Sequence, residues 1–328
     1  MIDQSNAPLV LAIPSKGRLQ ENTNHFFARA GLLFKQSRGE RDYRGVIAGV
    51  PDVEVAYLSA SEIAAELASG GAHLGITGED LIRENIEDAS ERLALLTPLG
   101  FGHANVVVAV PQAWIDVIRM SDLEDVAARF RQRHGRKMRV ATKYVNLTRR
   151  FFAQHGISDY RIVESLGATE GAPASGSAEL IVDITTTGAT LTANALKVIE
   201  DGIMLRSEAN LVASVVAHWG ERQRQAVASI LRRIAAEEEA RTHREVRADL
   251  TTLRDPQWHD LRERFEARPV GVPTDGGICV QCPAQNVFAL TDYLLQAGAQ
   301  RIGVSQSDYI FRPDNPLLDA LEERIGPA

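Results

Sequence analysis

Cysteine is scarce in this chain: Cys279 and Cys282 are the only two among 328 residues. So few thiols exclude the disulfide framework of small secreted domains and favour a reducing compartment, so we expect a cytoplasmic protein. Long apolar runs are also missing. Even the run 104–110 has only the length of a strand, whereas a membrane-spanning helix needs about 20 apolar residues. Residues 1–8 contain neither a basic nor a long apolar segment, which predicts that the chain carries no signal peptide.

An excess of positive charge is missing as well. The chain has 36 Lys and Arg against 43 Asp and Glu, which gives a net charge of -7. This balance excludes a broad nucleic-acid-binding surface but permits a local basic pocket for phosphates. With 45% hydrophobic and 24% charged residues, the composition is that of a globular protein, and the length predicts two or three domains.

One stretch, 179–191, organises the rest of the sequence. The apolar run 180–184 is short and rich in β-branched residues, as in a buried parallel strand, and a helical pattern follows from Leu191. Between them lies a turn of small and hydroxyl-bearing residues, whose backbone N–H groups can converge on a phosphate. The alternative is an ordinary turn whose threonines cap the helix. The residues of this turn are Thr185, Thr186, Thr187, Gly188, Ala189 and Thr190.

Three other strand-to-helix corners carry polar or charged residues. The run 8–13 ends in a turn with Lys16 and Arg18, which is either a phosphate-binding turn or a solvated basic turn. The strand 72–76 is followed by 77–80, which either caps a helix or contacts a ligand. The strand 138–141 leads into 142–150, which is either a nucleotide clamp or a helix start capped by Asn146.

The alternation of strands and helices up to about residue 215 predicts an α/β fold with mainly parallel sheets. Because 95–110 reads as strand, glycine turn and strand, the chain is expected to cross between two lobes near residue 103. We predict that 1–103 and 190–215 form the first lobe and 104–189 the second. A ligand cleft between the lobes would gather the four corners.

Residues 216–328 are expected to form a C-terminal helical and small αβ domain. The segment 218–250 reads as helix with a charged, solvated face between 237 and 247, whereas a partner-binding helix is the alternative. The runs 277–281, 286–297 and 301–305 read as strand, helix and strand. Cys279 and Cys282 have the spacing of half a zinc site, but without further cysteines we favour a buried thiol pair.

Several motifs of this chain resemble those of a known family, the ATP phosphoribosyltransferases, which begin histidine biosynthesis. The similarity is distributed over about 8–215, in matching order and spacing. The motifs that carry it are KGRL at 16–19, LGITGEDL at 74–81, LGFG at 99–102, RVATKY at 139–144, NLTR at 146–149, GATE at 167–170, IVDITTTGATL at 181–191, AN at 193–194 and LKVIEDG at 196–202.

The resemblance implies a fold and a reaction. The fold would be two-lobed and similar to type II periplasmic binding proteins, with the active site between the lobes. N1 of ATP would attack C1 of phosphoribosyl pyrophosphate (PRPP) and expel pyrophosphate, with Mg2+ bound through the pyrophosphate rather than by the protein. Since both substrates are polyanions, a cationic cleft would offset their repulsion, and catalysis would come from orientation and electrostatic stabilisation.

The resemblance also assigns residues. Lys16, Arg18 and Asp183 would be catalytic, with Glu170 as candidate proton acceptor. Asp183 and the turn 185–190 would hold PRPP, including Thr185, Thr186, Thr187, Gly188, Ala189 and Thr190. The ATP side would comprise Gly78, Glu79, Asp80, Lys143, Tyr144 and Arg149, with Tyr144 available to stack on the base.

Two departures from the family pattern stand out. Many relatives carry an arginine and an Asp-Ile-Pro turn where this chain has Ser59–Ala64, so an arginine contact there must be absent or supplied elsewhere. Glu179 stands where aspartate is common.

For the C-terminal third, the resemblance implies a candidate regulatory domain of ferredoxin or ACT type with histidine as feedback inhibitor. It also implies a homo-oligomer, dimer or hexamer, or reliance on a separate regulatory subunit. Two rival functions are a solute-binding protein of the same fold and an inactive or regulatory paralogue. The missing export signal disfavours the first, and the intact stretch 183–190 disfavours the second.

Overall fold

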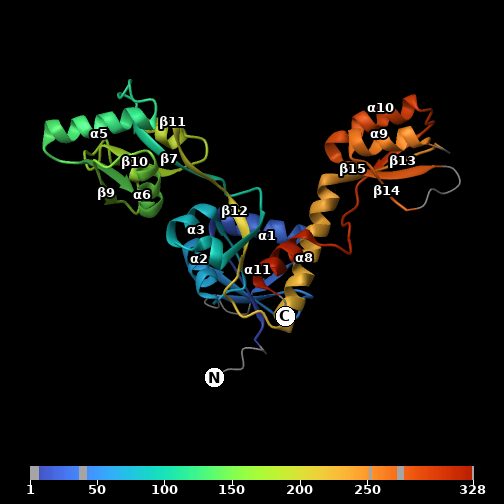
Figure 1. Ribbon diagram of the computed structural model, residues 1–328. Helices are drawn as coiled ribbons and strands as arrows, with labels where there is room; N and C mark the ends of the chain where they lie inside the picture. Colours follow the sequence, from blue (N-terminus) through green and yellow to red (C-terminus); the bar gives the residue numbers. More distant parts are fainter. Residues whose placement is uncertain (1–6, 37–42, 251–252, 272–276, 327–328) are drawn as a thin grey trace.

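The chain forms three α/β units arranged like a V (Figure 1). This computed structural model describes residues 7–36, 43–250, 253–271 and 277–326. A seven-stranded sheet forms lobe I at the base, a five-stranded sheet forms lobe II in one arm, and a four-stranded sheet forms the C-terminal domain in the other. None of the described helices is both long and apolar enough to cross a membrane.

Lobe I is built on a mixed sheet of order β2-β3-β4-β1-β5-β12-β6. Only β1 with β4 and β1 with β5 pair in parallel, so the sheet is less parallel than the sequence suggests, although the α/β class is confirmed. Its elements are β1 (Leu9–Pro14), α1 (Gly17–Arg29), β2 (Phe34–Gln36), β3 (Arg44–Ile47), β4 (Val53–Leu58), α2 (Ala60–Ser69), β5 (Leu74–Gly78), α3 (Glu79–Asn85), α4 (Ala89–Arg92), β6 (Leu93–Pro98) and β12 (Ala209–Ser214).

The strand β1 is buried on both faces, which is why its sequence is a continuous apolar run. Leu11 and Ile13 point to one side, where they join a core with Phe27 of α1 and with the helix α8 (Glu221–Thr242). Ala12 points to the other side and packs with Ile63 of α2. Helices on both faces thus fix the carboxyl end of β1, where Lys16 and Arg18 follow.

His73, just before β5, ties this sheet to the segment that follows β12. Its Nδ1 accepts a hydrogen bond from the Val10 amide at 3.0 Å, so its Nε2 carries the proton toward the His218 carbonyl, also at 3.0 Å. Burial lowers the pKa of His73 below its ordinary value of 6.5. Protonation would therefore break the bond from Val10.

We expect this histidine to make the fold acid-sensitive. Because its pKa is lowered only in the folded state, the unfolded chain takes up the proton first, and stability falls as the pH drops below about 6.5. Urea unfolding at pH 7.5 and pH 5.5 should show this loss in the native protein. His73→Gln, which retains an acceptor and a donor without titrating, should show a smaller loss; an equal loss in both proteins would contradict the assignment.

Lobe II has a sheet of order β11-β7-β10-β8-β9, in which β10, β8 and β9 run parallel. The chain returns to lobe I at 207–209 and not near residue 190, because β11 pairs along β7 and belongs to lobe II. Its elements are β7 (Ala104–Pro111), α5 (Met120–His134), β8 (Met138–Thr142), α6 (Val145–Gln154), β9 (Tyr160–Glu164), the 3-10 turn η2 (Thr169–Gly171), β10 (Leu180–Thr185), α7 (Ala189–Ala193) and β11 (Leu196–Ser207).

Two adjacent crossing segments, 99–104 and 207–209, connect the lobes. Leu99 N–H donates to the Ala209 carbonyl at 2.9 Å, and Ala209 N–H donates to the Phe101 carbonyl at 3.0 Å. The Gly100 amide donates to the Glu208 carboxylate at 3.0 Å. The predicted crossing near residue 103 thus lies in a hydrogen-bonded pair of segments.

The helix α8 (Glu221–Thr242) runs from lobe I into the C-terminal domain (Figure 1). The sequence prediction of helix to residue 250 is wrong, because 243–248 form a strand. The expected solvated face is present only in part: Glu238 and Arg241 are exposed and pair at 2.6 Å. Glu237, in contrast, is buried and pairs with Arg29 at 2.9 Å, and Glu239 accepts from Arg312 at 2.6 Å. These pairs join α8 to lobe I and to the C-terminal segment.

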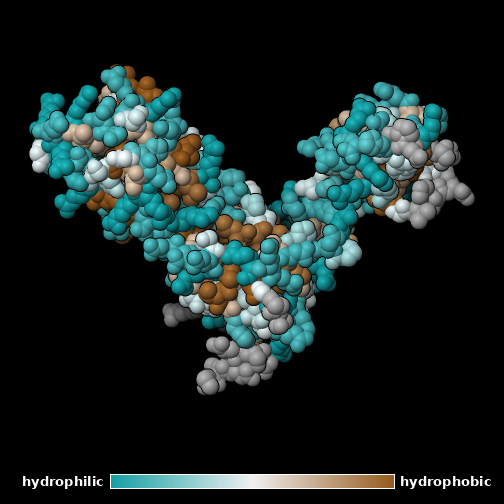
Figure 2. All heavy atoms as spheres, in the orientation of Figure 1, coloured by the Kyte–Doolittle hydropathy of each residue, from teal (hydrophilic) through white to brown (hydrophobic). Residues whose placement is uncertain are grey.

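Hydrophilic side chains cover most of the visible face of both arms (Figure 2).

The C-terminal domain has ferredoxin-like topology, since its strands and helices alternate as βαββαβ and every neighbouring strand pair is antiparallel. Val280 and Cys282 face the helices, while Cys279 lies three residues earlier on the opposite face, so the two thiols point apart. The elements are β13 (His243–Ala248), α9 (Asp255–Phe265), β14 (Arg268–Pro269), β15 (Ile278–Pro283), η3 (Ala284–Asn286), α10 (Val287–Gln296) and β16 (Ile302–Ser305), followed by α11 (Pro316–Ile325), which packs back on α8 and β6.

Candidate functional site

The turn between β10 and α7 is shaped by its own hydroxyl groups. Thr185 Oγ1 accepts from the Gly188 amide at 2.8 Å, and Thr187 Oγ1 accepts from the Ala189 amide at 3.4 Å. Gly188 has φ of +77°, a left-handed conformation that favours glycine. Thr186 donates to the His103 carbonyl at 2.9 Å, which attaches the turn to the crossing segment. The turn is therefore ordered, and Ala189 and Thr190 are exposed with the rest of its outer edge.

Asp183, Glu170 and Lys143 gather beside this turn. The Asp183 carboxylate accepts from the Ile184 amide at 2.8 Å. Burial and the nearby charge of Glu170 raise the pKa of Asp183, against the opposing effects of the Ile184 amide and Lys143. The structure thus brings together three residues that the sequence analysis placed on two different substrates.

At the β1–α1 corner, Lys16 and Arg18 are both exposed. Within the described part of the chain neither side chain has a hydrogen bond or ion pair, and the first turn of α1 holds no acidic residue. Gly17 has φ of +72°, and a Cβ there would meet nothing within 4 Å. Lys16 also lines a cavity of about 540 Å³ that extends to Arg44 and Ser59. The corner is open to an anion.

The β5–α3 corner is different, because its acidic side chains are already bonded. Glu79 accepts from Arg83 one turn later, at 3.1 Å. Asp80 is buried and accepts from Ser207 Oγ at 2.8 Å and from Tyr144 Oη at 2.7 Å. A Cβ on Gly78 would lie 2.3 Å from Asp80 Oδ1, so the glycine makes room for this carboxylate.

Tyr144 and Arg149 do not occupy the places expected of nucleotide ligands. Tyr144 is 1% exposed and packs in the core of lobe II, so no ring face is open to a base. Burial, followed by the charge of Asp80, raises its pKa. Arg149 lines a separate hollow with Lys137 and Tyr160, at the start of β8 and β9 and therefore at the opposite end of the sheet from Lys143.

Two residues that the sequence analysis missed, Glu84 and Ser207, also belong to the contact between the lobes. Ser207 is the last residue of β11, and no local pattern marks it. Glu84 follows Asp80 by one helical turn on α3, so the i, i+4 spacing could have placed both carboxylates on one helix face.

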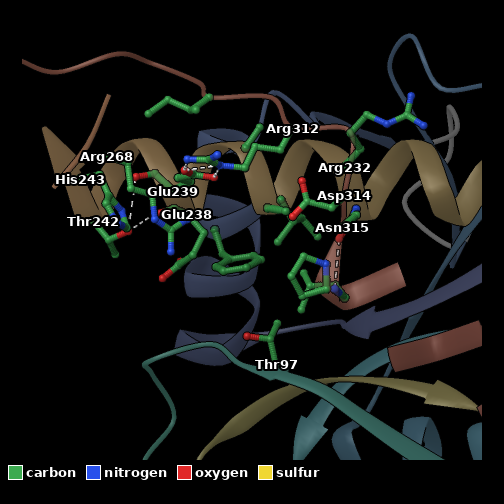
Figure 3. A pocket seen from close by; sticks show the side chains of 17 residues that line it. Thr97, Arg232, Glu238, Glu239, Thr242, His243, Arg268, Arg312, Asp314 and Asn315 are labelled. Carbon is green, nitrogen blue, oxygen red and sulfur yellow. Dashed lines mark hydrogen bonds and ion pairs between the residues drawn. The ribbon is translucent and has the colours of Figure 1, made fainter. Parts of the chain in front are cut away.

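A second cavity, of about 410 Å³, lies where lobe I meets the C-terminal domain (Figure 3). Arg312 joins its walls, donating to Glu239 and, at 3.0 Å, to Gln281 of β15. Asn315 caps α11 with its Oδ1, and its buried Nδ2 has no partner among the described residues. Ionisable lining residues include Arg232, Glu238, His243, Arg268 and Asp314.

Known proteins similar to this chain identify its family. A family model described as HisG: ATP phosphoribosyltransferase matches residues 59–236. The ATP phosphoribosyltransferase of Nitrobacter hamburgensis is 58% identical over 323 residues, which cover 98% of this chain and 99% of that protein. The chain belongs to the ATP phosphoribosyltransferase family. The ATP phosphoribosyltransferase of Bradyrhizobium diazoefficiens is likewise 58% identical over 319 residues, which cover 97% of this chain and 98% of that protein.

A solved member of the ATP phosphoribosyltransferase family supports the same fold. The ATP phosphoribosyl transferase (HisG:HisZ) complex from Thermotoga maritima matches with a TM-score of 0.53 and 27% identity, covering 69% of this chain and 95% of that chain. The matches to the curated relatives, by contrast, extend over nearly the whole chain, so these relatives share the C-terminal domain.

Both departures from the family pattern have structural roles in this chain. Ser59 caps α2 by accepting from the Glu62 amide at 3.3 Å, and the Glu62 side chain accepts from the Ser59 amide at 2.8 Å. Glu179 accepts hydrogen bonds from Arg136 and Arg139. Burial acts to raise the pKa of Glu179, but the arginine hydrogen bonds outweigh it and lower the pKa to about 2.

Proposed function

We propose that the chain transfers the phosphoribosyl group of PRPP to N1 of ATP and releases pyrophosphate, as the first step of L-histidine biosynthesis in the cytoplasm. The observation that carries the proposal is the ordered turn 183–190 in a chain 58% identical, over nearly its whole length, to a curated ATP phosphoribosyltransferase. A solute-binding protein of the same shape would have no need for Lys143 and Glu170 beside that turn.

The reaction assigns a task to each side of the cleft. The turn 185–190 holds the 5-phosphate of PRPP through backbone N–H and hydroxyl groups, and Asp183 accepts hydrogen bonds from the ribose hydroxyls. Lys16 and Arg18 hold substrate phosphates from lobe I. The N1 lone pair forms the bond to C1, and the C1–O bond electrons leave with pyrophosphate. The adenine then loses an amino proton, for which Glu170 is the proposed acceptor.

Mg2+ is proposed to arrive with the pyrophosphate. No group of three or more His, Cys, Asp or Glu side chains able to hold a metal occurs in the ranges that the structure describes. Asp183 and Glu170 are near enough to influence each other, and one or two carboxylates plus substrate phosphates are the usual surroundings of this ion. When bound, it neutralises charge on the leaving group.

The test is pyrophosphate release by the purified chain with ATP, PRPP and Mg2+. Release that requires both substrates, and that depends on Asp183, supports the proposal. A folded protein that binds both substrates without release would instead indicate an inactive paralogue or a missing partner subunit. Since the Thermotoga maritima structure is a HisG:HisZ complex, a regulatory subunit should then be added before the reaction is judged. Failure to bind either substrate would reject the proposal.

We also propose that the C-terminal domain makes the enzyme responsive to histidine and that the chain acts as a homo-oligomer, a dimer or hexamer. The observation favouring regulation is the cavity of Figure 3, which contacts α1 through Phe26 and the C-terminal domain through Arg268. Its acidic and basic lining suits a zwitterion. Calorimetric titration with L-histidine should show binding that Arg268→Ala weakens and Arg247→Ala, on an exposed part of β13, leaves unchanged. Mass photometry gives the assembly state.

A further inference from the structure

The helix α3 of lobe I contacts the first turn of α6 in lobe II through a carboxylate. Glu84 Oε1 accepts from the Asn146 amide and Glu84 Oε2 from the Leu147 amide, both at 2.9 Å. Asn146 returns a bond through Nδ2 to the Glu84 carbonyl at 3.0 Å. Glu84 is 8% exposed. Its whole carboxylate is therefore committed to the other lobe.

A second buried contact lies one helical turn away. Tyr144 Oη donates to Asp80 Oδ2 at 2.7 Å, and Ser207 Oγ donates to Asp80 Oδ1 at 2.8 Å. The Asp80 amide donates back to Ser207 Oγ at 2.9 Å. Because Ser207 ends β11 at the crossing between the lobes, this carboxylate joins the crossing segment, α3 and the corner of lobe II.

The α6 amides that Glu84 occupies are those that would otherwise suit an external anion. Asn146 and Leu147 are the second and third residues of α6, and unpaired N–H groups there are the usual binding point for a phosphate at a helix start. A carboxylate from lobe I fills this point instead. In this arrangement the corner therefore contacts α3 of lobe I through these two amides.

We propose that Glu84 and the Asp80–Tyr144 pair are positioning residues, which set the angle between the lobes for the transfer. This inference rests on the proposed function, because the transfer needs the PRPP turn of lobe II held against the cationic corner of lobe I. Reacting atoms must approach to about 3–3.5 Å, and a misplacement of about 1 Å can cost 100-fold in rate.

The first test is Glu84→Ala. We expect kcat to fall by about 10- to 100-fold, while the dissociation constants of ATP and PRPP, each measured alone, stay within about threefold. Glu84→Gln, which keeps one acceptor oxygen, should recover part of kcat. Glu87→Ala is the matched control, because Glu87 is an exposed carboxylate just beyond the same helix.

The second test measures lobe orientation without any substrate. Spin labels at Glu91→Cys in lobe I and Gln132→Cys in lobe II, both exposed, on a Cys279→Ser background, report the distance between lobes. We expect a broader distribution in Glu84→Ala, and also in Tyr144→Phe, which removes only one hydroxyl. If Glu84→Ala does not fold, the distance distribution of Tyr144→Phe tests the proposal instead.

The outcomes separate the two proposals. A native-like distance distribution and native kcat in folded Tyr144→Phe and Glu84→Ala would overturn the positioning role. Lower thermal stability with unchanged kcat and distances would also overturn it, since that is the result of a merely structural contact. If the native protein shows no transferase activity even with a regulatory subunit added, but the distributions broaden, the two contacts set the angle between the lobes and the proposed function fails.

Discussion

Replacing Asp183 by alanine is expected to lower kcat/KM for pyrophosphate release by at least about 100-fold. The carboxylate makes one described hydrogen bond within the protein, to the Ile184 amide, and lies next to the turn 185–190. Hydrogen bonds to a charged group contribute about 1.5–3 kcal/mol each, so losing two bonds to ribose hydroxyls suffices for this decrease. Initial rates with each substrate varied in turn give kcat/KM, and calorimetry gives the affinity for PRPP.

The control for Asp183→Ala is Glu164→Ala. Glu164 is an exposed carboxylate at the end of β9, at the same edge of the lobe II sheet, and it should leave kcat/KM unchanged. The kcat/KM of Asp183→Asn, which keeps the shape of the side chain and loses its charge, should lie between those of Asp183→Ala and Glu164→Ala. An alanine variant that turns over PRPP as the native protein does would remove Asp183 from the site.

The raised pKa of Asp183 adds a pH dependence to the same residue. Burial favours its protonated form, so the carboxylate takes up a proton at a higher pH than an exposed aspartate would. As the pH falls, activity should therefore decline at a higher pH than it would with an exposed aspartate, and the affinity for PRPP should decline with it. In Asp183→Asn the residual activity should lack this acid limb, which a pH profile of kcat/KM shows directly.

The strand-to-helix corners were predictable from the sequence because their signals are local. An apolar run followed by glycine and hydroxyl residues marks both the β1–α1 corner and the turn 185–190. The hydrogen-bond partners of individual side chains were not predictable. Tyr144 and Asp80 lie 64 positions apart, and only the packing of the two lobes shows that they bond to each other and not to a ligand.

In the C-terminal third, the sequence pattern predicted the wrong secondary structure for one segment. Residues 243–248 carry four ionisable side chains, and beside the long α8 they read as more helix. Only Val246 and Ala248 face the domain core, an alternation too short to outweigh the helical pattern before it. The late return of the chain at 207–209 was missed for a related reason: the pairing of β11 with β7 joins segments almost a hundred residues apart.

Substituting Lys16 and Arg18 together by alanine is expected to lower kcat/KM by about 100-fold, mainly through KM. In the described ranges both cations lack protein partners and stand at the open β1–α1 corner. Two charge-assisted bonds to phosphate at about 1.5–3 kcal/mol each account for the loss.

The discriminating feature of this pair is that the fold does not need it. Exposed side chains without partners change stability by only about 0.5 kcal/mol, so urea unfolding of the double variant should match that of the native protein. The charge-matched control Lys35→Ala/Arg133→Ala removes two exposed cations, on β2 and α5, that are not part of the corners, and should leave KM unchanged. A similar rise of KM in the control would mean that the net charge of the protein attracts the substrates. A rise confined to the Lys16 and Arg18 variant would assign binding to the β1–α1 corner, because the two variants lose the same charge.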